Sequence, residues 1–144
     1  MKTIALLFLT LFMTKGCSNE EKRQLATAEI VYTTTSRGSF QKITIHNQEV
    51  SINKDKNDEG LGVTSKISDA NWSDLVQLFG KLDLEKLSTY EGPTQKRLYD
   101  GAAIANLKVT NKEKEYNSAS FDHGNPPIEI EDFIKKVLLV ATKE

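Results

Sequence analysis

The chain is poor in cysteine, proline and histidine. Its 144 residues include one cysteine, Cys17, three prolines and two histidines. A single cysteine excludes an internal disulfide and a cysteine-rich metal site. The two histidines, His46 and His123, are far apart in the sequence, and neither has a second ligand one helical turn away, the spacing that favours zinc. We therefore expect neither a metal ion nor a cofactor.

Two further absences narrow the function. The formal net charge is only -1 and no basic cluster stands out, so we expect no nucleic-acid partner. The signatures of common catalytic sites are also missing, because the sequence contains no Gly-x-Ser-x-Gly turn and no glycine-rich phosphate loop. These absences leave enzymatic activity uncertain and favour a non-enzymatic role.

The sequence also lacks a long hydrophobic run. Residues 4–13 are apolar except for Thr10, and Lys2 precedes them. A helix that crosses a membrane needs about 20 apolar residues. A shorter run behind a basic residue is typical of a secretory signal peptide.

The residues that follow this run are Thr14-Lys15-Gly16-Cys17, and an acidic pair, Glu20 and Glu21, comes shortly after them. The four residues resemble the lipobox of bacterial lipoproteins, in which small residues precede a cysteine that is acylated. The acidic pair is similar to the surface-export signal of lipoproteins from Bacteroidota. The resemblance covers about the first 21 residues and implies nothing about the function of the domain that follows.

This resemblance implies that residues 1–16 are a signal peptide and that Cys17 becomes the lipid-modified, palmitate-bearing N-terminus. Residues 17–27 would then be a lipidated N-terminus and flexible spacer, and the protein would be membrane-anchored in the cell envelope, at the periplasmic face of the outer membrane or at the cell surface. The alternative is an ordinary signal peptide that is cleaved elsewhere, with Cys17 incidental.

After the spacer, the sequence pattern is typical of short β-strands. Four segments are rich in β-branched or alternating apolar residues and are separated by short polar connections, which predicts an antiparallel meander. The segments are residues 29–35, 40–46, 50–52 and 61–67.

Two helices and a hairpin complete the expected fold. Residues 68–80 have an apolar stripe between the N-cap Ser68 and the stop Gly80. A hairpin of residues 102–121 follows, and the last helix begins after Pro126-Pro127. The order ββββ-α-ββ-α predicts a single α+β domain over residues 28–144, with an antiparallel sheet of about six strands and two helices on one face.

The apolar stripes define an expected core. The residues share a position on the inward side of a predicted helix or strand. They are Trp72, Leu75, Phe79, Ile104, Phe121, Phe133, Val137 and Leu138.

One segment has an incomplete calcium-loop pattern. Asp55, Asn57 and Glu59 have the spacing of the first half of an EF-hand loop. The position that needs a bidentate glutamate is Lys66, so we interpret the segment as a solvated turn.

The predicted hairpin also brings polar residues together. With a two-residue turn at Asn111-Lys112, Lys108 pairs with Glu115, and Asp100 lies opposite His123 at the open end. We expect one rim there, either a site for a polar ligand or a structural capping arrangement. Its residues are Arg97, Tyr99, Asp100, Asp122, His123 and Asn125.

These observations favour an exported lipoprotein with a non-enzymatic domain that binds a ligand or a protein, as an inhibitor or accessory subunit. The expected partners are the membrane, reached through the lipid, and an envelope protein or a glycan. One alternative is a small envelope hydrolase whose site lies in loops 90–101 and 122–127, with Asp100 and Asp122 as an acid/base pair. Another is a purely structural part of a surface complex.

Overall fold

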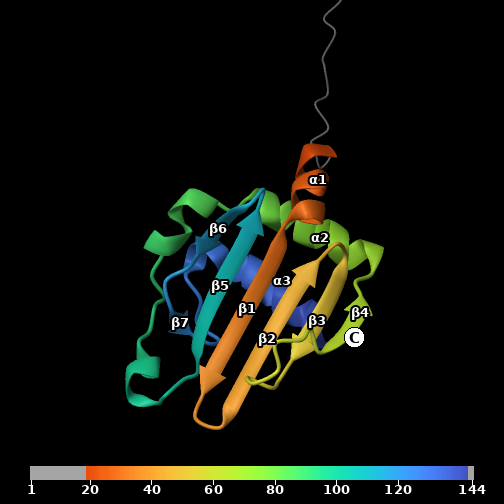
Figure 1. The fold of residues 1–144 in the computed structure, drawn as a ribbon. Coiled ribbons are helices and arrows are strands. Elements are labelled where there is room, and N and C mark those ends of the chain that lie inside the picture. The colour runs from red at the N-terminus through yellow and green to blue at the C-terminus, as the bar shows by residue number, and fades with distance from the viewer. Residues whose placement is uncertain (1–18, 143–144) are drawn as a thin grey trace, which may run out of the picture.

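The computed structural model describes residues 19–142 (Figure 1). The expected signal peptide and the lipid attachment at Cys17 lie outside the described residues. None of the helices within residues 19–142 combines the length and apolar character that crossing a membrane requires.

The described chain contains short strands and helices, and three of the helices are 3-10 turns labelled η. The strands are β1 (Glu29–Ser36), β2 (Ser39–His46), β3 (Glu49–Asn53), β4 (Val63–Lys66), β5 (Ile104–Asn111), β6 (Lys114–Asn117) and β7 (Phe121–Asp122). The helices are α1 (Asn19–Thr27), α2 (Asp69–Gly80), η1 (Leu84–Thr89), η2 (Lys96–Tyr99), η3 (Ile128–Ile130) and α3 (Glu131–Thr142).

The strands form one antiparallel sheet in the order β4-β3-β2-β1-β5-β6, and the two-residue β7 pairs with the first half of β5. Helices α2 and α3 pack together behind this sheet, and α1 stands at the end from which β1 starts (Figure 1). The expected α+β class, with an antiparallel sheet and helices on one face, is confirmed.

Alternation along the strands explains why only one face meets the helices. In β1, Ile30 and Tyr32 are buried, whereas Val31 between them is half-buried. Their cross-strand neighbours on β2, Ile45 and Ile43, are buried as well. Because successive strand side chains point to opposite faces, this pattern places one apolar layer against the helices.

The two long helices close the core from behind. The Ser68 hydroxyl accepts a hydrogen bond from the Asn71 backbone N–H at 3.3 Å and so caps α2. Phe79 of α2 and Phe133 of α3 meet with ring centroids 6.1 Å apart. Aromatic pairs at this separation add stability beyond the area they bury.

The expected core is largely confirmed. Leu75, Phe79, Phe121, Phe133 and Val137 are buried, while Trp72 and Leu138 pack against the core and are partly exposed. The expectation for Ile104 was wrong, since this side chain is 41% exposed. It alternates with the buried Ala105 and therefore points to the other face of the sheet.

The segment expected to be a flexible spacer is instead a helix. The α1 helix begins at Asn19 and packs against α2 and β2. Leu25 is only 1% exposed, and so is Ala28, which follows the helix. Leu25 of α1 therefore contributes to the core, although the sequence placed the start of the domain at Ala28.

The expected hairpin register was also wrong. Positive φ angles of 50° and 64° place the turn at Lys112-Glu113, so that Asn111 pairs with Lys114 and Lys108 with Asn117 rather than Glu115. A two-residue type I′ turn requires exactly such a pair of positive φ angles. The shift is even, so every side chain keeps its face, and the hydrophobic pattern does not distinguish the two registers.

Candidate functional site

The corrected register divides the expected rim into separate groups. Asp122 lies opposite Ile104 on β5, not opposite Gly101, because the later turn shifts the register by two residues and the irregular segment between β6 and β7 shifts it by one more. The His123 N–H donates to the Ala103 carbonyl at 2.9 Å. The register that placed Asp100 opposite His123 therefore does not occur.

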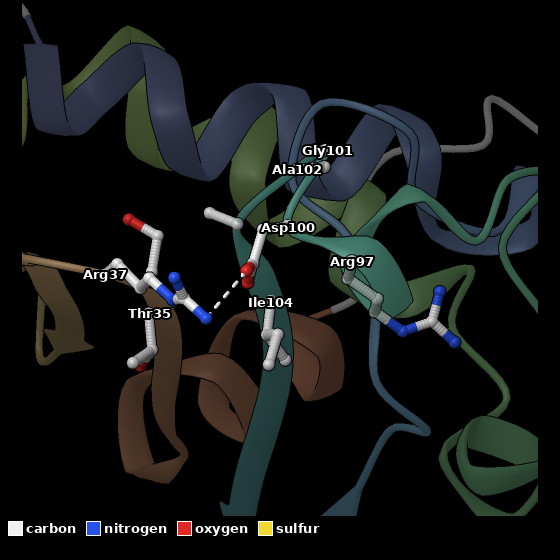
Figure 2. Close-up of a pocket in the computed structure, with 9 residues that line it drawn as sticks. Thr35, Arg37, Arg97, Asp100, Gly101, Ala102 and Ile104 are labelled. Atoms are coloured by element: carbon white, nitrogen blue, oxygen red, sulfur yellow. Dashed lines mark ion pairs between the residues drawn. The ribbon is translucent and has the colours of Figure 1, made fainter.

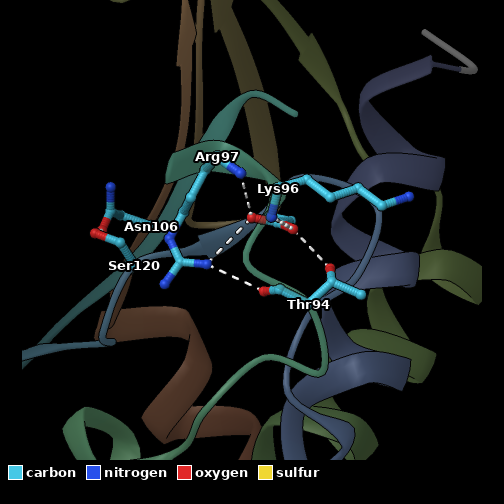
Figure 3. A network of polar contacts seen from close by, with 6 residues as sticks. Thr94, Lys96, Arg97, Asn106 and Ser120 are labelled. Carbon is cyan, nitrogen blue, oxygen red and sulfur yellow. Dashed lines mark hydrogen bonds and ion pairs between the residues drawn. The ribbon is translucent and has the colours of Figure 1, made fainter. Parts of the chain in front are cut away.

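Asp122 is the centre of the first group, and its side chain is fully buried. One carboxylate oxygen accepts hydrogen bonds from the Thr94 hydroxyl at 2.6 Å and the Lys96 backbone N–H at 2.7 Å. The other accepts from the backbone N–H of Arg97 at 3.0 Å and from its guanidinium at 3.1 Å (Figure 3). A carboxylate has about four lone-pair positions, so these donors satisfy it.

This network determines the charge state of Asp122. Burial alone raises the pKa of a carboxyl group, because it penalises the charged form. The hydrogen bonds from Thr94, from the Arg97 and Lys96 backbone N–H groups and from the Arg97 guanidinium outweigh burial and hold the pKa of Asp122 well below its ordinary value. The residue is therefore a permanent anion at neutral pH.

The network has a structural function. The two backbone N–H groups that Asp122 accepts belong to the first turn of η2, so its side chain ties this turn to β7. The Arg97 guanidinium also donates to the Thr94 carbonyl at 3.1 Å, and its side chain is 17% exposed. Asn125 joins the same group through its N–H, which donates to the Asp122 carbonyl at 2.9 Å. For Arg97, Asp122 and Asn125, a structural capping arrangement therefore describes the contacts better than a ligand site does.

His123 belongs to a second group. Its Nδ1 shares a hydrogen bond of 2.9 Å with the hydroxyl of Tyr32, which is a buried residue of β1. Burial raises the pKa of Tyr32 well above its ordinary value. The two residues are 91 positions apart, so no local sequence signal connects them.

Asp100 belongs to the third group, which surrounds a hollow in the surface. The hollow has a volume of about 630 Å³ and lies between residues 35–37, at the end of β1, and residues 100–104, at the start of β5 (Figure 2). The Asp100 carboxylate meets the Arg37 guanidinium at 3.2 Å there, and the two side chains are 65% and 89% exposed. Tyr99, the residue before Asp100, is 72% exposed.

The local backbone explains why Asp100 reaches the hollow. It ends η2 in the left-handed region, with φ of 59°, and its N–H donates to the Lys96 carbonyl. Aspartate tolerates this conformation better than most residues. The sequence pattern points to Tyr99 and Asp100 but not to Arg37, because the Arg37–Asp100 contact joins a hairpin turn to a loop about sixty residues later.

The residues with the partial calcium pattern stabilise their own loop. Asp55 and Asp58 each accept a hydrogen bond from a backbone N–H two residues ahead, at 2.9 Å and 2.8 Å. The Asn53 amide donates to the Asp58 and Gly60 carbonyls. These are turn contacts. Within residues 19–142, no three His, Cys, Asp or Glu side chains converge as metal ligands would.

No model of a known protein family matches the chain, and comparison with curated proteins and with solved structures finds no relative.

Proposed function

We propose that this protein is an exported lipoprotein, anchored in the cell envelope through Cys17, whose domain binds a ligand at the hollow beside Arg37 and Asp100. The observation that carries the binding role is the hollow itself, which combines concave shape with convergent polar groups and an apolar wall. The lipobox-like residues before Cys17 support the anchor.

The position of the hollow suits an anchored protein. It lies at the end of the sheet away from α1, which follows the proposed lipid attachment (Figure 1). Strand β1 runs between the two ends and has eight residues, which corresponds to about 25 Å. Only Ser18 separates Cys17 from α1, so a lipid there would hold the domain close to the membrane and direct the hollow away from it.

The Asp122 network favours binding over hydrolysis. The hydrolase alternative needs Asp100 and Asp122 as a pair that exchanges protons. Asp122 already accepts four hydrogen bonds, and its pKa is held low, whereas Asp100 is paired with Arg37. Asp122 therefore stays ionised at neutral pH with its lone pairs occupied, so it does not exchange protons with Asp100.

Metabolic labelling with a radioactive fatty acid tests the anchor. We expect the protein to incorporate the label and to partition with membranes, because two or three acyl chains anchor firmly at about 0.8 kcal/mol per buried CH₂. Cys17→Ser removes the acceptor, whereas Ser18→Ala is a matched control that keeps it. Label that persists in Cys17→Ser, or that is missing from both forms with Cys17, contradicts the proposal.

A further inference from the structure

The hollow carries no net charge. Arg37 and Asp100 neutralise each other across it. Arg97 also lines the hollow, but its guanidinium points away from Asp100 and is neutralised by the buried Asp122 (Figures 2 and 3). An anionic or cationic ligand that binds one member of the Arg37–Asp100 pair is repelled by the other member. An uncharged ligand meets no such repulsion.

The same ion pair offers many unused hydrogen-bonding positions. A guanidinium has five N–H donors and a carboxylate about four acceptor positions, and the Arg37–Asp100 contact uses one of each. Both side chains are largely exposed, so the remaining positions are accessible. Thr35 and Ser36 also line the hollow, but as successive residues of β1 they point to opposite faces of the sheet, so at most one of their hydroxyls is on the side of the ion pair. A hydroxyl group both donates and accepts hydrogen bonds. Two neighbouring hydroxyls on one ligand can therefore accept from the Arg37 guanidinium and donate to the Asp100 carboxylate at the same time.

The hollow also has apolar lining residues. They are Ala102, Ala103 and Ile104, and Ile104 is exposed beside Thr35, its cross-strand neighbour. The exposed ring of Tyr99 lies close to Gly101, which lines the hollow, since a Cβ placed on Gly101 would be 2.9 Å from its Cε2 atom. An exposed aromatic face and aliphatic carbons are suited to packing against the C–H face of a sugar ring.

We infer that the hollow binds an uncharged saccharide, with neighbouring hydroxyls on Arg37 and Asp100 and a ring face against Ile104, in reach of the neighbouring Tyr99. This inference rests on the proposed binding function and specifies the class of ligand. A zwitterion such as a free amino acid is less suitable, because each of its charges gains little from a partner that is already neutralised and exposed to water. A protein partner would use the exposed Tyr99 without needing the concave shape.

Saturation-transfer NMR on the lipidated protein in phosphocholine micelles tests this inference. The ligands are glucose, N-acetylglucosamine, cellobiose and lactose at millimolar concentration, with glycine as the zwitterion. We expect saturation transfer to at least one saccharide and none to glycine. Asp100→Asn and Arg37→Gln should each weaken that binding about tenfold, which corresponds to one hydrogen bond to a charged group.

The matched control is Glu115→Gln, which breaks the exposed Lys108–Glu115 pair elsewhere on the sheet and should leave binding unchanged. Saccharide binding that is equal in Asp100→Asn overturns the inference, and so does transfer to glycine alone or to none of the ligands.

A second experiment separates this failure from that of the proposed function. In this experiment a photo-crosslinking residue replaces Tyr99. A crosslink to an envelope protein that disappears when Asp100→Asn is added would show that the hollow binds a protein and that only the saccharide class is wrong. Without saccharide binding and without such a crosslink, both proposals fail.

Discussion

The helix α1 provides a sharp test, because the sequence and the structure disagree about it. Leu25 is its buried apolar side chain, at 1% exposure, and it belongs to the main hydrophobic core. Truncation of a buried leucine to alanine costs about 2–5 kcal/mol, depending on how far the site collapses. A nine-residue helix is marginal on its own, so α1 depends on this contact to stay folded.

We expect Leu25→Ala to lower the free energy of unfolding by about 2–3 kcal/mol, the lower half of the range, because α1 lies at the margin of the core and can detach without opening it. Urea denaturation followed by circular dichroism measures this change. Amide hydrogen exchange should show, in addition, that the N–H groups of α1 lose protection while those of β1 keep theirs.

Arg23→Ala is the matched control, since Arg23 lies on the same helix and its side chain is exposed. An exposed substitution of this kind changes stability by about 0.5 kcal/mol or less. The reasoning is refuted if Leu25→Ala behaves like Arg23→Ala. In that case α1 is not docked, and residues 19–27 are the spacer that the sequence suggested.

Two further perturbations test the core and the Asp122 network. Phe133→Ala should cost about 3–5 kcal/mol in the same urea assay, and a much smaller loss would mean that α3 is not packed against α2 as described. The lowered pKa of Asp122 means that its ionised form stabilises the fold above the ordinary carboxyl pKa, about 3.9, and that this contribution is lost as the pH falls further. The thermal midpoint of the wild type should therefore decline more steeply below about pH 4 than that of Asp122→Asn, and parallel declines would contradict the network.

The sequence predicted what depends on local pattern. Strand alternation placed Ile43 and Ile45 on one face of the sheet. The helical stripe placed Leu75 and Phe79 on the side of α2 that packs against that face. Both signals repeat every few residues, so a short window contains them. The α1 helix was missed because its described part has one buried leucine among polar residues, which is too little to form a stripe.

The hairpin register was missed for a different reason. The expected register paired Lys108 with Glu115, and the observed register pairs it with Asn117, two residues later, so both pairs join side chains on one face. The difference lies in the turn, where Lys112 and Glu113 adopt positive φ although neither residue type favours it. Tertiary pairing overrides local preference there, and sequence reasoning from turn propensities points to the wrong dipeptide.

The error in register then carried over to the site, because it treated Asp100 and Asp122 as equivalent members of one rim. The structure separates them by burial. Asp122 is fully buried, and its four donors would be left without an acceptor if it were truncated. Asp100 forms an exposed ion pair, and such pairs contribute only about 0–1 kcal/mol to stability. Substitution of Asp100 therefore changes the surface of the hollow while the fold stays intact, which makes Asp100 the residue at which binding is tested separately from stability.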